Sequence, residues 1–130
     1  MIVCDTNILI EFYKKTPNVV QELHAIGYKH LAISAITQAE LYFGALDKAE
    51  LRKITTHLSL LTVLPLTNSI SGRFIELMER YCLSHKLSLP DAMIAATSVM
   101  HQHDLYTLNR KDFHFITGIS LYQPVTYTSP

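Results

Sequence analysis

Short apolar runs alternate with longer stretches of helical periodicity along almost the whole chain, and this alternation constrains the fold more than any other feature. Runs such as Ile2-Val3-Cys4 and Leu31 to Ser34 are too short for helices and are typical of buried strands. Strands that alternate with helices form βαβ units around a parallel sheet, so the sequence predicts the α/β class. The predicted strands cover residues 2–4, 31–34, 62–66, 105–108 and 119–122, and the predicted shorter helices cover about 7–15, 18–26, 69–85 and 89–101.

One predicted helix is longer than the others. It starts at Thr37, runs into the fifties and continues or restarts towards Leu60. Gly44 lies inside it, where a glycine costs about 1 kcal/mol relative to alanine. Close packing against another helix is the expected reason for this glycine. The helix from Leu89 to His101 is rich in alanine, so we expect it to be buried and closely packed.

Length and composition restrict the class of protein further. The chain has 130 residues, 48% hydrophobic and 17% charged, which predicts one globular domain over residues 1–130 and excludes disorder and coiled coil. Two cysteines are too few for a disulfide framework or a cysteine zinc site. No apolar run is long enough to span a bilayer, so we expect a cytoplasmic protein without a membrane partner. Eleven Lys and Arg balance eleven Asp and Glu, which argues against a simple basic clamp for nucleic acid.

Four acidic residues fall where predicted strands end or the following helices begin. Asp5 closes the first strand, and Glu40 lies early in the helix that follows the second. Asp91 lies in the first turn of the alanine-rich helix, and Asp112 follows the strand at residues 105–108. Ligands of open parallel sheets bind at the carboxyl ends of the strands, so these acids are predicted to share one edge.

Helix capping is an alternative explanation for each acid except Asp5. Thr37 and Glu40 have the spacing of a capping box, and so do Ser88 and Asp91. Asn109 has the position to cap a turn that contains Asp112. Acids in a first turn also gain roughly 0.3–1 kcal/mol from the helix dipole. Asp5 differs because a carboxylate at the end of an apolar strand is costly to bury unless it is paired or binds a metal.

Several carboxylates at one edge would repel one another and raise their own pKa values. A hard divalent cation such as Mg²⁺ or Mn²⁺ removes that repulsion, because it prefers oxygen ligands and keeps several waters. Such a centre activates water and stabilises the charge on a transferring phosphoryl group. The joint pattern therefore favours metal-dependent phosphodiester hydrolysis.

Four sequence motifs carry a family resemblance over essentially the whole length of the chain. They are MIVCDTNILIEF, SAITQAELYFGA, LPDAMIAAT and LYTLNRKDFHFITGISLY, in that order. With these motifs the chain resembles the PIN-domain nucleases, and more narrowly the VapC-type toxins of bacterial toxin–antitoxin pairs. The resemblance implies a three-layer α/β/α fold with a central, mainly parallel sheet. It also implies a Mg²⁺- or Mn²⁺-dependent endoribonuclease that cuts structured RNA such as tRNA and is inhibited by a VapB-like antitoxin.

The resemblance assigns roles to particular residues. Asp5 and Asp91 are expected to hold the metal directly, and Glu40 to bind it through water or to orient the attacking water as a base. Asp112 stands as the fourth catalytic acid, with Asn109 where many relatives have Asp. The expected outer shell of the site comprises Thr6, Asn7, Thr107 and Asn109. Whether Asn109 or Asp112 fills the fourth position stays open, and so does the number of metal ions, one or two.

Two surfaces are predicted to meet partners. The basic residues Lys86, Arg110 and Lys111 are expected to hold RNA phosphates, with ordinary solvated surface charge as the alternative. Some helices carry apolar side chains on more than one side, which a single core-facing stripe does not require. We expect the second side to bind another copy of the chain in a homodimer or the C-terminal arm of an antitoxin, which would place an Arg or Lys in the acidic site. The predicted contact residues are Leu9, Phe12, Tyr42, Phe43 and Leu46.

Two other functions remain open at this level. A PIN-like module without hydrolytic activity could serve as a scaffold, and the Asn at position 109 keeps that alternative in view. A housekeeping PIN nuclease acting on RNA precursors or DNA flaps is the other. The balanced net charge excludes none of these nucleases, because a bound metal would offset at least three of the acids.

Overall fold

A four-stranded parallel sheet forms the centre of the molecule. The computed structural model describes residues 1–125. Strands β1 (Ile2–Cys4), β2 (Leu31–Ser34), β3 (Thr62–Leu64) and β4 (Asp104–Tyr106) lie in the order β3-β2-β1-β4. Within the sheet Ile2 pairs with both Leu31 and Asp104. The expected parallel α/β fold is confirmed.

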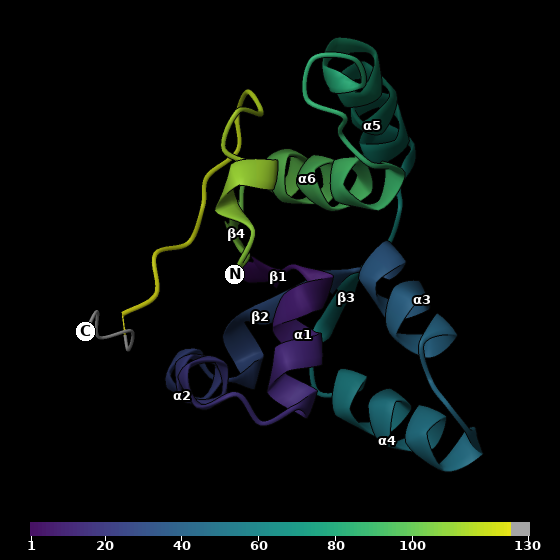
Figure 1. Ribbon diagram of the computed structural model, residues 1–130, viewed down its shortest axis with the longest axis vertical. Helices are drawn as coiled ribbons and strands as arrows, with labels where there is room; N and C mark the ends of the chain where they lie inside the picture. The colour runs from purple at the N-terminus through teal and green to yellow at the C-terminus, as the bar shows by residue number, and fades with distance from the viewer. Residues whose placement is uncertain (126–130) are drawn as a thin grey trace.

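Within residues 1–125, six α-helices and two short 3₁₀ helices connect and follow these strands. The α-helices are α1 (Thr6–Tyr13), α2 (Pro17–Ile26), α3 (Ala35–Phe43), α4 (Lys48–Leu58), α5 (Asn68–Tyr81) and α6 (Leu89–His101), and the 3₁₀ helices are η1 (Tyr28–His30) and η2 (Arg110–Asp112). Helices α5 and α6 cover one face of the sheet, and α1 to α4 lie on the other side, which produces three layers (Figure 1). Within residues 1–125, no helix has the length and apolar character needed to cross a bilayer.

Side-chain alternation along the strands divides the core into two halves. Val3 and Ala32 pack towards α5 and α6, while Cys4 and Ile33 pack towards the other helices, and all four are fully buried. This follows from the two-residue period of a strand, which sends successive side chains to opposite faces. The alanine-rich helix α6 is buried as expected, with Ala92, Ala95 and Ala96 all at 0% exposure.

The long helix predicted from Thr37 is two helices separated by a short connection. Gly44 caps the C-terminus of α3, and Asp47 caps the N-terminus of α4 by accepting a 2.8 Å hydrogen bond from the Glu50 backbone N–H. The prediction that Gly44 packs closely against another helix is wrong. A Cβ atom there would meet only the carbonyl oxygens of Glu40 and Leu41, at 3.6 and 3.8 Å, which is ordinary contact.

The C-terminal segment differs from its prediction as well. A strand was expected at residues 119–122, but pairing is limited to one isolated bridge between Leu105 and Leu121. Beyond it the Tyr122 hydroxyl donates to the carboxylate of Glu22, a residue of α2 with only 1% exposure. The Val125 N–H donates to the same carboxylate at 3.1 Å. The segment therefore crosses from β4 to α2 and bonds to a side chain instead of extending the sheet.

Candidate active site

Asp5 lies at the carboxyl end of β1 and is only 4% exposed. It is the N-cap of α1, and its Oδ1 accepts a hydrogen bond from the Thr6 backbone N–H at 2.8 Å. Its Oδ2 accepts from the Thr107 hydroxyl, also at 2.8 Å. Thr107 reaches it because β1 and β4 are paired in register, with Cys4 opposite Tyr106. Each oxygen of the buried carboxylate thus has one donor and keeps a further lone pair for a ligand.

Glu40 is oriented by hydroxyl groups from two helices. The Thr6 hydroxyl donates to Glu40 Oε1 at 2.8 Å and lies 2.9 Å from the Thr37 hydroxyl. Because the single Thr6 hydroxyl proton is directed to Glu40, Thr37 is the donor to Thr6. Thr6 was expected in the outer shell of the site. Its backbone does support Asp5, but its side chain holds Glu40.

The capping explanation for Glu40 is wrong. Ser34 is the N-cap of α3, with its hydroxyl accepting from the Ile36 N–H at 3.2 Å, so the helix begins three residues earlier than the capping box required. Thr37 is instead fully buried and belongs to the site. In the capping alternative, Thr37 was the N-cap residue. The available signal was its position three residues before Glu40, on the same face of a helix.

Asp91 lies in the first turn of α6, and here the capping explanation holds. The Ser88 hydroxyl accepts from the Asp91 N–H at 3.2 Å. Capping does not satisfy the charge of the carboxylate, however. Burial raises the pKa of Asp91 to about 6, and the neighbouring charges of Asp5, Asp112 and Glu40 raise it as well, against a lowering hydrogen bond from Ser88.

The acids influence one another through space. Burial raises the pKa of Asp5, hydrogen bonds from Thr107 and Thr6 lower it, and the charges of Glu40 and Asp112 raise it again. Among the described residues, the salt bridges found join Lys14 to Glu11 and Arg73 to Glu76, and none reaches this group. We call Asp5, Glu40, Asp91 and Asp112 the acidic edge.

Asn109 occupies the N-cap position of η2, the turn that contains Asp112, but it does not cap the turn through its side chain as the capping alternative required. Its side chain makes no capping hydrogen bond at η2, and its backbone N–H donates to the Thr107 hydroxyl at 3.0 Å. Thr107 therefore receives a bond from this loop and passes one to Asp5. This places the start of the Asp112 loop beside the end of β1, which explains how a residue far along the chain joins the acidic edge.

The donor set of the acidic edge suits a hard cation. Within residues 1–125, no group of three or more Asp, Glu, His or Cys side chains is positioned to hold a metal ion. The carboxylates are nonetheless close enough to raise the pKa of Asp5 and Asp91. Mg²⁺ commonly binds through one or two carboxylates and retains several waters, so an open group of oxygen ligands fits it.

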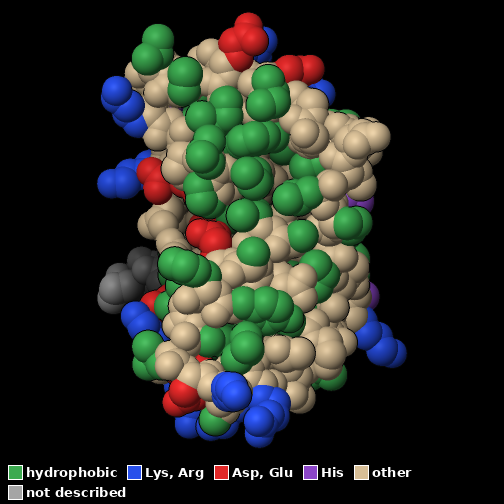
Figure 2. Space-filling model, turned by 90° about the vertical axis from the view of Figure 1, so that its right-hand side faces the viewer, with side chains coloured by type: hydrophobic (Ala, Val, Ile, Leu, Met, Phe, Trp, Pro, Cys, Tyr) green, Lys and Arg blue, Asp and Glu red, His purple; other side chains and the backbone are tan. Residues whose placement is uncertain are grey.

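Figure 2 views the side of the molecule on which α3 and α6 begin. Acidic side chains lie in the middle of this face, between two bands of hydrophobic side chains, and most Lys and Arg lie at its margins. The predicted phosphate-binding residues Lys86, Arg110 and Lys111 are exposed. The Arg110 guanidinium donates to the Tyr122 carbonyl oxygen at 3.2 Å, so part of its hydrogen-bonding capacity is used within the chain.

The predicted partner surface is partly wrong. Leu9 is at 0% exposure in the core with Val19 and Leu23 of α2, because α2 covers the second apolar side of α1. Phe12 and Tyr42 are half-buried. At the end of α3, by contrast, Phe43 is 94% and Leu46 87% exposed, which is unusual for large apolar side chains in a well-packed chain.

A groove of about 740 Å³ lies between α1, α3 and α4. Glu40 of the acidic edge lines it, as do apolar side chains such as Ile10 and Ile54 and the lysines Lys14, Lys15 and Lys53.

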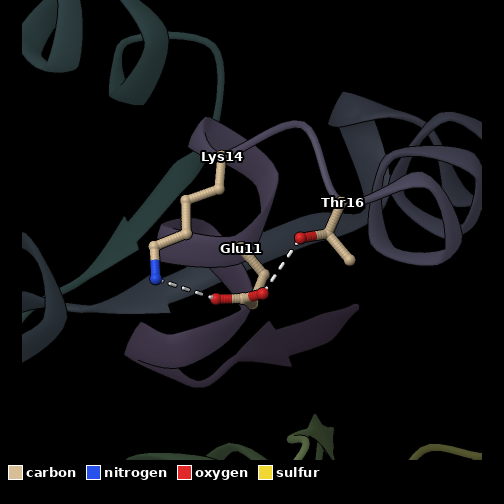
Figure 3. A network of polar contacts seen from close by, with 3 residues as sticks. All are labelled: Glu11, Lys14 and Thr16. Carbon is tan, nitrogen blue, oxygen red and sulfur yellow. Dashed lines mark hydrogen bonds and ion pairs between the residues drawn. The ribbon is translucent and has the colours of Figure 1, made fainter.

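The turn that carries the first two of these lysines is held locally. The Glu11 carboxylate accepts from the Thr16 hydroxyl at 2.9 Å and pairs with Lys14 at 3.5 Å (Figure 3).

Comparison with known proteins gives a consistent result. The sequence model of the PIN domain matches residues 2–116. The chain is 33% identical over 137 residues to the VapC ribonuclease Y4jK of Sinorhizobium fredii, covering 95% of this chain and 97% of that protein. It is 40% identical over 80 residues to the ribonuclease VapC10 of Mycobacterium tuberculosis, a match that spans 61% of this chain and 59% of that relative.

Solved structures show the same relationship. A chain of a toxin–antitoxin complex from Klebsiella pneumoniae superposes with a TM-score of 0.79 at 32% identity, covering 98% of both chains. The residues matched by the PIN-domain sequence model include all four acids of the acidic edge and every strand of the sheet. The chain belongs to the PIN-domain family and, within it, to the VapC type.

Proposed function

We propose that this chain is a Mg²⁺- or Mn²⁺-dependent endoribonuclease, the toxin of a type II, VapBC-type toxin–antitoxin pair. The observation that carries the proposal is the acidic edge, where Asp5 and Asp91 have raised pKa values and neighbouring carboxylates with unsatisfied charge. A scaffold has no need to maintain such repulsion. A hydrolase that holds a divalent cation does, because the cation offsets the repulsion when it binds.

The proposed roles follow from the hydrogen bonds of each acid. Thr107 and the Thr6 N–H each donate to one oxygen of Asp5, and each oxygen keeps a further lone pair for a ligand. Asp91 provides the second direct ligand from the first turn of α6. Glu40, held by Thr6, orients the attacking water and accepts its proton. Asn109 and Asp112 complete the outer part of the site.

A bound divalent cation would lower the pKa of the nucleophilic water and stabilise the charge that develops on the phosphate. The chain itself supplies positioning. Hydroxyl–carboxylate contacts of this kind commonly change metal affinity or activity 10- to 100-fold when they are removed. We therefore assign Thr6, Thr37 and Thr107 as positioning residues for Glu40 and Asp5.

The proposed substrate is a structured RNA such as a tRNA. Sequence-specific proteins recognise RNA mostly at single-stranded loops, bulges and ends, and an open edge is accessible to such a loop. Lys86 and Lys111 are exposed and available to phosphates. The net charge of zero implies that RNA binds weakly without metal and better with it, since the acidic edge repels phosphate until its charge is offset.

The proposed protein partners are an antitoxin and a second copy of the chain. The structural relative from Klebsiella pneumoniae is itself part of a toxin–antitoxin complex. The groove beside Glu40 has apolar walls, two acidic residues and three lysines, and the proposed antitoxin arm would lay its apolar side chains in it and direct one Arg or Lys at Glu40. The exposed Phe43 and Leu46 provide further apolar contact area for either partner.

Cleavage of RNA by the purified protein tests the proposal. Chain freed of any co-purified antitoxin is incubated with total RNA and with bulk tRNA, in Mg²⁺ or in EDTA. We expect discrete fragments in Mg²⁺ alone, and none from Asp5→Asn or Glu40→Gln. The variant Glu79→Gln, which removes a similar charge from the exposed surface of α5, serves as the control and should cleave normally. Cleavage that persists in EDTA, or in both site variants, would contradict the proposal, and no cleavage at all would favour a scaffold.

A further inference from the structure

Three aromatic rings from two distant segments form a cluster at the C-terminal end of α5. The imidazole of His85 stacks face to face on Phe115, with ring centroids 3.9 Å apart and an angle of 11° between the planes. Tyr81 meets both rings edge-on, at 5.6 Å from His85 and 5.1 Å from Phe115. We call these three residues the aromatic platform.

Hydrogen bonds from neighbouring groups hold the rings of the aromatic platform in place. Tyr81 is only 8% exposed, and its hydroxyl lies 3.0 Å from the Thr117 hydroxyl while accepting from the Thr117 N–H at 3.2 Å. The Ser84 hydroxyl lies 2.8 Å from His85 Nδ1, which restrains the imidazole ring. Phe115 is half-buried and His85 is exposed, so the imidazole is the outer member of a stack whose base is fixed.

Both segments of the aromatic platform lead directly to the acidic edge. Phe115 is three residues after Asp112, and a chain of that length spans at most about 10 Å. Turn hydrogen bonds from His114 N–H to Arg110 O and from Ile116 N–H to Phe113 O shorten this path further. His85 is six residues before Asp91, at most about 20 Å along the chain.

Positive charge flanks the stack. Lys86 follows His85 directly and is exposed, with a φ of 53° that a non-glycine residue seldom adopts. Arg80 precedes Tyr81 and contacts the Thr117 hydroxyl at 3.3 Å. Flat exposed rings beside Lys and Arg are the combination that binds unpaired bases of single-stranded nucleic acid, because every base has a face to stack and a phosphate beside it.

We propose that the aromatic platform binds one unpaired nucleobase of the RNA, stacked on the outer face of His85, a few nucleotides from the phosphodiester at the acidic edge. This inference rests on the proposed ribonuclease function and adds to it the residue that selects an unpaired base near the cut. Since stacking accepts any base, the platform selects for loop structure, with a preference for bases that stack well.

RNA binding measured without cleavage tests this proposal. All proteins carry Asp91→Asn, which prevents cleavage and lessens the repulsion of phosphate, and the buffer contains Mg²⁺ to screen the remaining charge of the acidic edge. Fluorescence anisotropy gives the Kd for a labelled tRNA anticodon stem–loop and for a series of the same RNA with one loop base removed at a time. The variants are His85→Ala, His85→Tyr, which retains a flat ring, and the control His30→Ala, an exposed histidine in η1 just before the start of β2.

We expect His85→Ala to weaken binding of the intact RNA about tenfold, which is within the usual effect of losing one base–aromatic stack. His85→Tyr should restore the affinity and His30→Ala should not change it. One abasic RNA should bind the unaltered platform more weakly and be insensitive to His85→Ala. That insensitivity separates stacking from a purely structural role, in which His85→Ala would weaken intact and abasic RNAs equally.

Three results would overturn the proposal. They are unchanged affinity in His85→Ala, equal weakening for every abasic RNA, and no measurable binding by the protein with an intact platform. Failure of the proposed function is recognised separately, by the cleavage assay with the wild-type chain. Cleavage together with an unchanged Kd for His85→Ala would reject the platform and leave the ribonuclease intact.

Discussion

Asp91→Asn should make the metal-free protein more stable while removing its response to metal. Burial and three neighbouring acids raise the pKa of Asp91 from 3.8 to about 6 in the folded chain. At pH 7.5 the folded protein must therefore hold a charge that its environment disfavours. The asparagine keeps the size of the side chain and an acceptor for Ser88 but carries no charge.

The size of this effect can be worked from the shift. A difference of about two pKa units corresponds to about 3 kcal/mol at most. Asp91 is partly solvent-exposed, so screening reduces this to about 1.5 kcal/mol. Losing an acid from the first turn of α6 forfeits about 0.5 kcal/mol of helix-dipole stabilisation. The free energy of unfolding should therefore rise by about 1 kcal/mol, which raises Tm by about 3 °C.

The sign depends on pH in a defined way. A carboxyl group with a raised folded pKa binds protons more readily in the folded than in the unfolded chain between pH 4 and 6. The penalty is therefore full above about pH 6 and absent below about pH 4. The stabilisation of Asp91→Asn should be present at pH 7.5 and disappear by pH 4.

Thermal unfolding in EDTA and in Mg²⁺ is the measurement. In EDTA, the Tm of wild type should be lower than that of Asp91→Asn. Saturating Mg²⁺ should reverse this order, since a ligand at 100 times its Kd adds about 2.7 kcal/mol to the free energy of unfolding. Glu79→Gln controls for the loss of one negative charge and should retain the wild-type response to Mg²⁺. An Asp91→Asn protein that is less stable than wild type in EDTA at pH 7.5, or still stabilised by Mg²⁺, would refute the reasoning.

Three further predictions concern other parts of the molecule. Thr107→Val removes the hydroxyl between Asp5 and Asn109 and should weaken Mg²⁺ binding, measured by calorimetry, 10- to 100-fold. An affinity equal to that of the exposed control Thr62→Val would contradict this role. Leu9→Ala should lower the free energy of unfolding by about 2–5 kcal/mol in denaturant, whereas Leu46→Ala should change it by less than about 0.5 kcal/mol and instead weaken antitoxin capture; the reverse ranking would show that the two surfaces are wrongly assigned. Tyr122→Phe removes one hydrogen-bond donor from the buried Glu22 and should lower the free energy of unfolding by about 1–3 kcal/mol. An unchanged denaturation midpoint would mean that the C-terminal crossing contributes little to stability.

Local signals in the sequence were sufficient for the class of fold and for the positions of the acids. Apolar periodicity located the four strands and the start of most helices to within a few residues, because burial of one face sets that period. The same signals failed where a cap competed with periodicity. Apolar residues on both sides of Gly44 suggested one helix, while the side chain of Asp47 starts a second by capping its N-terminus.

Local sequence signals were enough for the α/β class, the family motifs and the placement of Asp5, Glu40, Asp91 and Asp112 at junctions between strands and helices. Which groups hold those acids depends on how the strands pack together. Thr107 bonds to Asp5 across 102 positions of the chain and Thr6 bonds to Glu40 across 34, and neither contact has a local signature. They exist because β1 lies between β2 and β4, which brings the ends of three strands together. Periodicity and capping arise from neighbours in sequence, whereas strand order and register depend on the free energy of the whole packed core.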